Sequence, residues 1–149
     1  MDDRYFLRPG GFERVFNRTF GALIRLGIGL RHNYVLEVRG RKSGNVYTAP
    51  VNLIAIEGRD YLVAPRGETN WVRNARAAGR IALVKGRNRR EFTLRELAAA
   101  DRPPILKAYL DRYAPTVQRY FPIPKGSPAD SFTELAVRYP VFELTPANR

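Results

Sequence analysis

Residues 34–65 decide the fold of this chain, and they read YVLEVRGRKSGNVYTAPVNLIAIEGRDYLVAP. Three runs rich in β-branched and aromatic residues stand out: Tyr34–Arg39, Val46–Ile56 and Tyr61–Pro65. Polar segments that contain glycine separate them. β-branched and aromatic side chains favour strands, and glycine among polar residues favours tight turns. The stretch therefore predicts three antiparallel strands joined by hairpins.

A short helix and a second hairpin are predicted next. Residues Asn70–Ala78 favour a helix, with Thr69 or the first helical residue as the N-cap and Gly79 as a left-handed stop. The runs Arg80–Lys85 and Arg90–Leu94 then predict two strands around a polar turn. The order strand, helix, strand thus continues with short connections.

The C-terminal part is predicted to be mainly helical. Asp101 is placed to cap a helix that begins with two prolines and continues through Ile105–Tyr113, and Pro115 interrupts it. Ser131–Tyr139 predicts a last short helix, and Val141–Leu144 predicts a closing strand. Strands and helices in blocks favour an α+β domain with a small antiparallel sheet or barrel. A parallel dinucleotide-binding sheet is disfavoured.

The N-terminal segment Phe12–Gly27 predicts an amphipathic helix. Its apolar side chains recur at helical spacing, with arginines largely off that face. Such a helix packs on the core of its own domain or lies peripherally on a membrane, and both roles stay open. No apolar run approaches the roughly 18 residues that span a bilayer. The start, Met-Asp-Asp-Arg, does not resemble a secretory signal, so we expect a cytoplasmic protein.

Length and composition predict one folded domain over residues 1–149. Apolar residues make up 44% of the chain and charged residues 27%, a balance typical of globular proteins. The chain has no cysteine, which excludes disulfides, thiolate nucleophiles and thiolate metal sites. His32 is the only histidine, so a multi-histidine metal site is excluded as well. We expect no metal and no hydrolytic chemistry.

The net charge predicts an anionic partner. The chain has 26 basic and 14 acidic residues, a formal net charge of +12. Nucleic acid, an anionic membrane and a cofactor rich in phosphate and carboxylate all fit this excess. No helix-turn-helix, RNA-recognition or zinc motif is present, so we do not expect nucleic acid to be the partner.

Two segments combine features of an anion site. Gly40–Gly44 places two cations and a hydroxyl between glycines at a predicted turn, which suits phosphate, although a solvated hairpin tip has the same composition. In Arg66–Asn74 a strand end, a glycine and a helix N-terminus meet. Trp71 is expected either to line a site for a planar ligand or to pack in the core. Asn74 is expected to cap a helix, to bridge strands or to contact a ligand.

Five motifs occur in an order and spacing that are specific only when taken together. They are LEVRGRKSG at 36–44, TAPV at 48–51, YLVAPRG at 61–67, NWVRN at 70–74 and RYPVF at 138–142. This pattern resembles the deazaflavin-dependent nitroreductase family, mainly over residues 27–94. The resemblance implies a single-domain split β-barrel of mostly antiparallel strands with flanking helices. It also implies coenzyme F-420, a deazaflavin with a phosphate and a polyglutamate tail, whose reduced form donates hydride.

The resemblance assigns eleven residues to the coenzyme. Those implied to hold the phosphate and tail are Arg41, Lys42, Ser43 and Gly44. Those implied to line the ring are Thr48, Pro50, Ala64, Pro65 and Arg66, with Trp71 and Asn74 closing the far side. Two positions depart from the family. Tyr47 stands where members often have a basic residue, and Pro65 lies near a position where some members have a serine thought to protonate substrate.

The expected reaction is hydride transfer to a planar conjugated acceptor such as a quinone, an enone or a nitroaromatic. The coenzyme supplies the reactive carbon, so no side chain is assigned as catalytic. Candidates for the acceptor pocket are Tyr109, Tyr113 and Tyr139, with Tyr120 and Phe121 beside them, although core packing also explains these aromatics. The alternative is a protein that binds FMN or a similar ligand. We expect a monomer or a homodimer.

Overall fold

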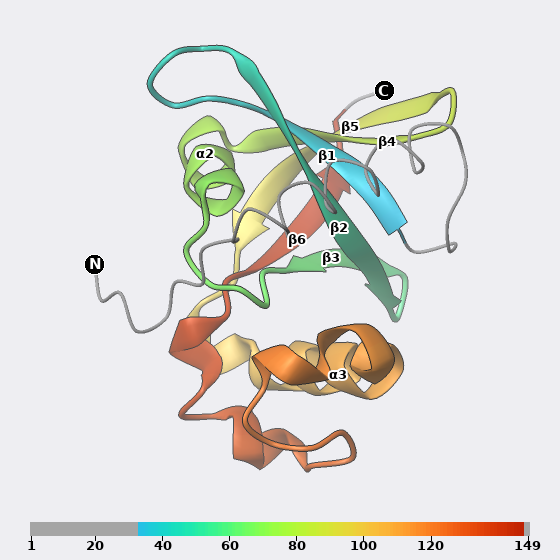
Figure 1. The fold of residues 1–149 in the computed structure, drawn as a ribbon, viewed down its shortest axis with the longest axis vertical. Coiled ribbons are helices and arrows are strands. Elements are labelled where there is room, and N and C mark those ends of the chain that lie inside the picture. The colour runs from blue at the N-terminus through green and yellow to red at the C-terminus, as the bar shows by residue number, and fades with distance from the viewer. Residues whose placement is uncertain (1–32, 148–149) are drawn as a thin grey trace.

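The computed structural model describes residues 33–147 of the chain. Six antiparallel strands close into a barrel in the order β1-β2-β3-β6-β5-β4 (Figure 1). The strands are β1 (Asn33–Arg39), β2 (Val46–Ile56), β3 (Arg59–Val63), β4 (Arg80–Lys85), β5 (Asn88–Glu96) and β6 (Val141–Pro146). The α+β class with a small antiparallel barrel, predicted from the sequence, is confirmed.

Two helices flank the barrel. Helix α2 (Asn70–Ala78) lies below the β1–β2 hairpin in Figure 1, and α3 (Pro103–Val117) lies at the other end, below β3. Within residues 33–147 the chain also forms the short 3-10 turns η2 (Ala99–Asp101), η3 (Gln118–Tyr120), η4 (Ala129–Phe132) and η5 (Ala136–Arg138). Helix α2 has the predicted bounds, and Gly79 ends it with φ 71°, as predicted.

The predicted N-cap of α3 and the predicted last helix are wrong. Asp101 belongs to η2, and Arg102 occupies the N-cap position of α3 instead. The predicted interruption at Pro115 is confirmed: the backbone of Tyr113 is non-helical (φ −114°, ψ 20°), and a second helical stretch continues from this kink to Val117. Over Ser131–Tyr139 the chain forms 3-10 turns, since 3-10 turns also bury apolar residues spaced three or four apart.

The predicted strands shift only at their ends. Strand β3 starts and ends two residues earlier than Tyr61–Pro65, because the chain leaves the sheet after Val63. Strand β5 runs from Asn88 to Glu96 and so extends the predicted Arg90–Leu94 at both ends. Pairing with both β4 and β6 supplies these additional ladder contacts.

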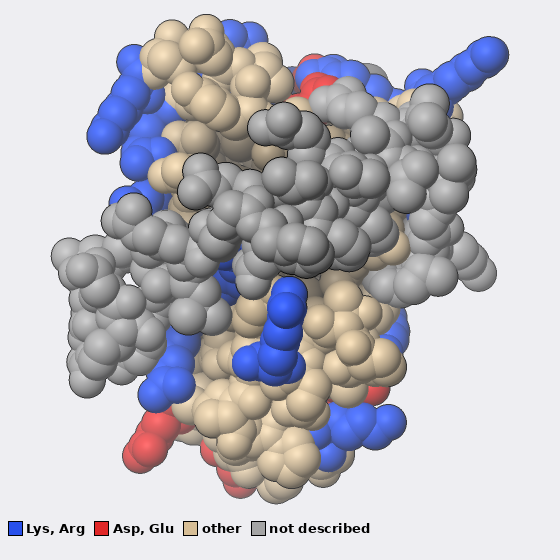
Figure 2. Space-filling view, viewed as in Figure 1, with Lys and Arg blue, Asp and Glu red and all other residues tan. Residues whose placement is uncertain are grey.

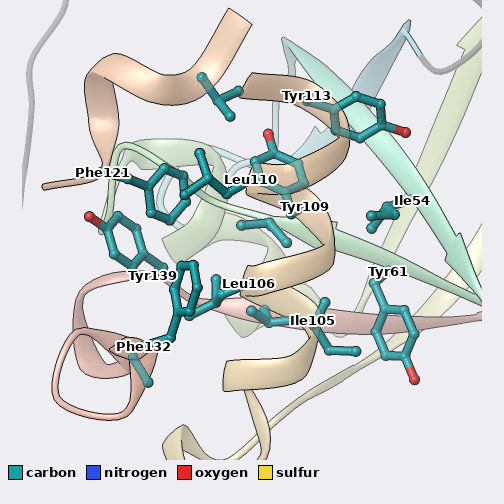
Figure 3. Close-up of a cluster of buried hydrophobic side chains, with 14 of the residues drawn as sticks. Ile54, Tyr61, Ile105, Leu106, Tyr109, Leu110, Tyr113, Phe121, Phe132 and Tyr139 are labelled. Atoms are coloured by element: carbon teal, nitrogen blue, oxygen red, sulfur yellow. The ribbon is translucent and has the colours of Figure 1, made fainter. Parts of the chain in front are cut away.

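Alternate side chains of the strands build two cores. The inner face fills the barrel, and α2 closes this core with Ala75 and Trp71; its buried strand residues are Leu36, Val38, Val51, Leu62, Ile81, Leu83, Phe92 and Leu144. The outer face packs against α3 (Figure 3), where Ile54, Tyr61, Val63 and Val141 meet the helix. The two helices thus lie on opposite faces of the same strands.

Some predictions fall outside the described residues. The N-terminal helix predicted over Phe12–Gly27 and the histidine His32 both lie there. Among residues 33–147, no helix combines the length and the apolar character needed to cross a membrane. In the same range, no three acidic or histidine side chains lie close enough together to hold a metal ion.

Candidate functional site

The hairpin between β1 and β2 is closed by its own hydrogen bonds. The Gly40 N–H donates to the Asn45 carbonyl at 2.7 Å, and the Gly44 N–H donates to the Gly40 carbonyl at 3.0 Å. Gly44 has φ 79°, a left-handed conformation that glycine adopts without strain. Ser43 Oγ accepts a hydrogen bond from the Asn45 N–H at 3.1 Å. These bonds give the turn a defined shape.

This turn presents cations without acidic partners. Arg39, Arg41 and Lys42 take part in none of the ion pairs formed within residues 33–147. In that range no group accepts a hydrogen bond from the backbone N–H groups of Lys42 and Ser43. Figure 2 shows blue and no red over the hairpin on this face. Uncompensated cations beside open N–H groups suit a multiply charged anion.

One buried amide fastens the hairpin to helix α2. Asn74 Oδ1 accepts hydrogen bonds from the Arg41 N–H at 3.1 Å and from Arg41 Nη1 at 2.7 Å. Asn74 is only 4% exposed, so its polar group needs such partners. Asn74 thus joins helix α2 to the hairpin, a contact other than the predicted bridging of strands, and its contact with a ligand stays a prediction.

Tyr47 covers the base of the hairpin. A Cβ added at Gly40 would lie 2.5 Å from Tyr47 Cε2, so only glycine admits the ring at this distance. The Tyr47 hydroxyl and Ser43 Oγ lie 3.2 Å apart, within hydrogen-bond distance. Tyr47 is 48% exposed. The residue that departs from the family pattern is therefore part of the surface of the turn.

Thr48 and Pro50 lie on the outer face of β2. The regular pairing of β1 with β2 puts them on the same side as Asn52 and Ile54. Ile54 is fully buried under α3, whereas Thr48 is exposed and Pro50 is half-buried. Strand β3 pairs with β2 only from Leu53 onward. The outer face of β2 thus leads from the cationic hairpin to α3, with its first half uncovered by β3.

The segment after β3 divides into an inner and an outer part. Ala64 is buried and packs with Val72 and Phe142 inside the barrel. Pro65 and Arg66 are half-buried. Of the three residues in this segment that the resemblance places against the ring, Pro65 and Arg66 therefore reach the surface of the described structure and Ala64 does not.

The N-terminus of α2 carries an orphaned hydroxyl. Thr69 occupies the N-cap position without a side-chain cap bond, and its buried Oγ1 has no hydrogen-bond partner in the described part of the chain. Trp71 packs its ring 6.0 Å from that of Phe142 and is half-buried. This packing favours the role of Trp71 as a core residue, and its role as a wall for a planar ligand stays a prediction. The unsatisfied hydroxyl at a helix N-terminus and the cationic hairpin both fit an anionic cofactor.

The three tyrosines predicted for the acceptor pocket belong to the core around α3 (Figure 3): Tyr109 and Tyr113 lie on the helix, and Tyr139 lies across the helix from Ile54 and Tyr61. Tyr109, Tyr113 and Tyr139 are all buried, and burial raises the pKa of each hydroxyl. The Tyr113 hydroxyl donates to the Leu53 carbonyl at 2.7 Å, and that of Tyr139 donates to the Tyr120 carbonyl at 2.6 Å. This geometry favours the core-packing alternative, and a role in acceptor binding stays a prediction.

Sequence reasoning did not find the contact between Glu68 and Arg76. Arg76 Nη1 and Nη2 each lie 2.8 Å from one oxygen of the Glu68 carboxylate. Because the two residues are separated by a loop and two helical turns, no periodic pattern relates them. The only sequence signal is an acidic residue just before a predicted helix that carries arginines.

Comparison with known proteins identifies the family. The model of the family described as F420H(2)-dependent quinone reductase matches residues 13–122. None of the curated proteins matches the sequence. A solved structure described as an F420-H2 dependent reductase is 21% identical, with a TM-score of 0.51 over 80% of this chain and 100% of that chain.

Two further solved structures show the fold. A chain described as a domain-swapped dimer is 19% identical, with a TM-score of 0.56 over 90% of this chain and 93% of its own. A Listeria innocua protein assigned as a pyridoxamine 5′-phosphate oxidase is 10% identical, with a TM-score of 0.52 over 79% and 86%. The predicted split-barrel fold is thus confirmed. Because the family match spans most of the chain, the protein belongs to the F420H(2)-dependent quinone reductases, oxidoreductases that use the deazaflavin coenzyme F-420 to reduce quinone-type acceptors.

Proposed function

We propose that the β1–β2 hairpin binds the phosphate and acidic tail of coenzyme F-420, and that the outer face of β2 beside it carries the deazaflavin ring. The observation that carries this proposal is the set of cations on the turn, Arg39, Arg41 and Lys42, which have no acidic partner among residues 33–147. The partner that neutralises them is then the coenzyme itself.

Arg41, Lys42, Ser43 and Gly44 form the proposed tail site. Asn74 fixes Arg41 through one Nη and the backbone, so the remaining guanidinium donors are already oriented when the anion arrives. Such preorganisation lowers the entropy lost on binding. Lys42 adds an exposed ammonium, and Gly44 has no side chain to block close approach of a phosphate to the backbone.

Thr48, Pro50, Pro65 and Arg66 form the proposed ring site. Pro65 and Arg66 follow β3, the strand that pairs with β2 from Leu53 onward, and both are half-buried. Two apolar proline rings, a hydroxyl and a guanidinium are side chains of the mostly apolar, sparsely polar kind that line sites for planar ligands. Ala64, Trp71 and Asn74 support this surface from the inside through packing and the hairpin bridge.

When bound, the reduced coenzyme supplies the hydride, and the chain contributes orientation and electrostatics. Pro65 has no hydroxyl, and those of Tyr113 and Tyr139 donate to backbone carbonyls. We therefore assign no side chain as the proton donor. The acceptor class extends in this proposal from quinones to enones and nitroaromatics, which share a planar conjugated system.

A titration with coenzyme F-420, followed by Trp71 fluorescence, tests the proposal. The double variant Arg41→Ala/Lys42→Ala should bind more weakly, because each lost charge-assisted contact contributes about 1.5–3 kcal/mol. The control Arg119→Ala/Lys125→Ala removes the same charge near the end of α3 and should bind as the wild type does. FMN, the alternative ligand, has no polyglutamate tail and should compete poorly. Unchanged affinity of the hairpin variant would disprove the proposed site.

The location of the acceptor and the oligomeric state extend the proposal. Quinones partition into membranes, so the amphipathic helix predicted over Phe12–Gly27 would bring the site to its substrate. Co-sedimentation with anionic liposomes, with and without residues 1–32, tests this contact. One similar structure is described as a domain-swapped dimer, which favours a homodimer over a monomer. Light scattering after size-exclusion chromatography distinguishes the two.

A further inference from the structure

Four side chains from different elements form a network of ion pairs. Nη1 and Nη2 of Arg76 each donate a hydrogen bond to a different carboxylate oxygen of Glu68, both at 2.8 Å. On its other side, Arg76 Nε lies 2.7 Å from Glu96 Oε1 and Nη2 lies 3.0 Å from Glu96 Oε2. Arg102 Nη2 lies 3.2 Å from Glu96 Oε2. This network links the loop before α2, helix α2 itself, the end of β5 and the start of α3.

Arg102, at one end of this network, is buried. Arg102 is 9% exposed, and its Nε donates to the Leu97 carbonyl at 3.0 Å. Its Nη1 donates to the carbonyls of Ala136 at 2.9 Å and Tyr139 at 3.4 Å. The guanidinium is therefore fixed to the backbone on both sides of α3, in the segments that follow β5 and precede β6.

The other end of the network, formed by Glu68 and Arg76, restrains residues 64–68. The Ala64 N–H donates to the Pro140 carbonyl at 2.9 Å, next to the segment that Arg102 fixes. Glu68 is fixed by Arg76. Between these anchors the Gly67 N–H donates to the Ala64 carbonyl at 3.1 Å. The segment that contains Pro65 and Arg66 is thus tied at both ends to one frame.

The network has the features that make ion pairs effective. Isolated exposed pairs contribute little, whereas bidentate contacts in a shared network lose less side-chain entropy per pair. The side chains of Glu68 and Glu96 are each 25% exposed, and Arg76 binds both carboxylates. Arg76 also neutralises Glu68, whose carboxylate would otherwise repel an anionic coenzyme beside the loop.

We propose that Glu68 and Arg76 are positioning residues for hydride transfer: they hold residues 64–68 against the coenzyme ring without touching coenzyme or acceptor. The proposal rests on the proposed function, which places Pro65 and Arg66 at the ring. A misplacement of the ring by about 1 Å can cost about 100-fold in rate. The network is therefore expected to act on the rate of transfer as well as on stability.

The test compares Glu68→Gln, Arg76→Gln and Arg76→Lys with a matched control. Arg89 also bridges two glutamates, Glu37 and Glu91, but it lies on β5, away from the loop. Hydride transfer to menadione is measured in single turnovers with saturating reduced coenzyme, below the unfolding transition of every variant. Both glutamine variants should transfer about 10- to 100-fold more slowly, with partial rescue in Arg76→Lys, while Arg89→Gln keeps the wild-type rate.

The charge that Glu68→Gln removes distinguishes a positioning role of Glu68 from a direct electrostatic effect on coenzyme binding. Glu68→Gln removes an anion and should not weaken binding of an anionic coenzyme, so a slower transfer at saturation reports misplacement. Wild-type transfer rates in Glu68→Gln and Arg76→Gln would overturn this inference, even if both variants melt at lower temperature. If Arg41→Ala/Lys42→Ala loses coenzyme affinity in the same experiments, the proposed function stands when this inference fails.

Discussion

The carboxamide oxygen of Asn74 accepts two hydrogen bonds from Arg41, one from the backbone N–H at 3.1 Å and one from Nη1 at 2.7 Å. A single buried atom thus connects the cationic hairpin to helix α2. The hairpin is exposed on most sides, so this contact determines where its charges point.

Replacing Asn74 by alanine should release the hairpin. A buried polar contact of this kind contributes about 1–3 kcal/mol to the free energy of unfolding, which urea denaturation measures. Coenzyme binding should weaken as well, because Arg41 loses its fixed orientation. Asn74→Asp keeps the acceptor oxygen but neutralises Arg41, and so it should fold well and bind the coenzyme weakly. Wild-type affinity in Asn74→Ala would show that the bridge does not matter for binding.

Tyr47→Lys should tighten coenzyme binding. Tyr47 lies on the turn with its hydroxyl 3.2 Å from Ser43 Oγ, so an ammonium at this position would face the same anion. A new charge-assisted contact of about 1.5 kcal/mol corresponds to about tenfold in affinity. The gain should shrink as salt is added, because the site is exposed. Calorimetric titration at two ionic strengths checks both points, and Tyr47→Met controls for loss of the phenol.

The pH dependence of stability should report the contact between Glu68 and Arg76. Hydrogen bonds from Arg76 hold the pKa of Glu68 below its ordinary value of 4.5. A carboxylate with a lowered pKa in the folded state stabilises the protein above its ordinary pKa and loses this effect as the pH falls through the folded value. The melting temperature of the wild type should therefore exceed that of Glu68→Gln at about pH 7 and approach it at about pH 3. A constant difference would contradict this assignment.

Tyr113→Phe distinguishes a core residue from an acceptor-binding residue. The Tyr113 hydroxyl donates to the Leu53 carbonyl at 2.7 Å, so its loss should cost about 1 kcal/mol of stability. The KM for menadione should stay at the wild-type value, because the ring remains buried. A several-fold rise in KM without loss of stability would instead assign Tyr113 to the acceptor pocket, as the sequence first suggested.

The sequence predicts what short segments determine. β-branched runs predict β2 over its observed residues and β1 to within one residue, and Gly79 marks the end of α2, since these choices depend on local conformation. Pairing of β3 with β6 brings together residues about eighty positions apart, and no local pattern encodes it. The 3-10 turns at η4 and η5 likewise depend on what their apolar residues pack against.

The candidate site likewise has features that short segments determine and features that only the tertiary structure determines. The cations and glycines of residues 40–44 are visible in the sequence because an anion-binding turn uses adjacent residues. The bridge from Arg41 to Asn74 and the chain from Glu68 to Arg102 join separate elements, so they follow only from the tertiary structure. Burial of Tyr109 and Tyr139 is also tertiary, since aromatic spacing on a helix is the same in a pocket and in a core.

The edge of β2 that β3 leaves unpaired, before Leu53, has a consequence for association with other strands. Val46 and Tyr47 are 55% and 48% exposed at the start of this strand, a composition that invites another strand to add itself. Pairs with and without hydrogen bonds alternate along an antiparallel ladder. The Gly40 N–H donates to the Asn45 carbonyl, so counting back along β1 and β2 makes Val35 and Pro50 a pair without hydrogen bonds. The nitrogen of Pro50 therefore faces the edge that β3 leaves open, and it has no hydrogen to donate. As far as residues 33–147 are concerned, proline at this position therefore disfavours the addition of another strand along this edge.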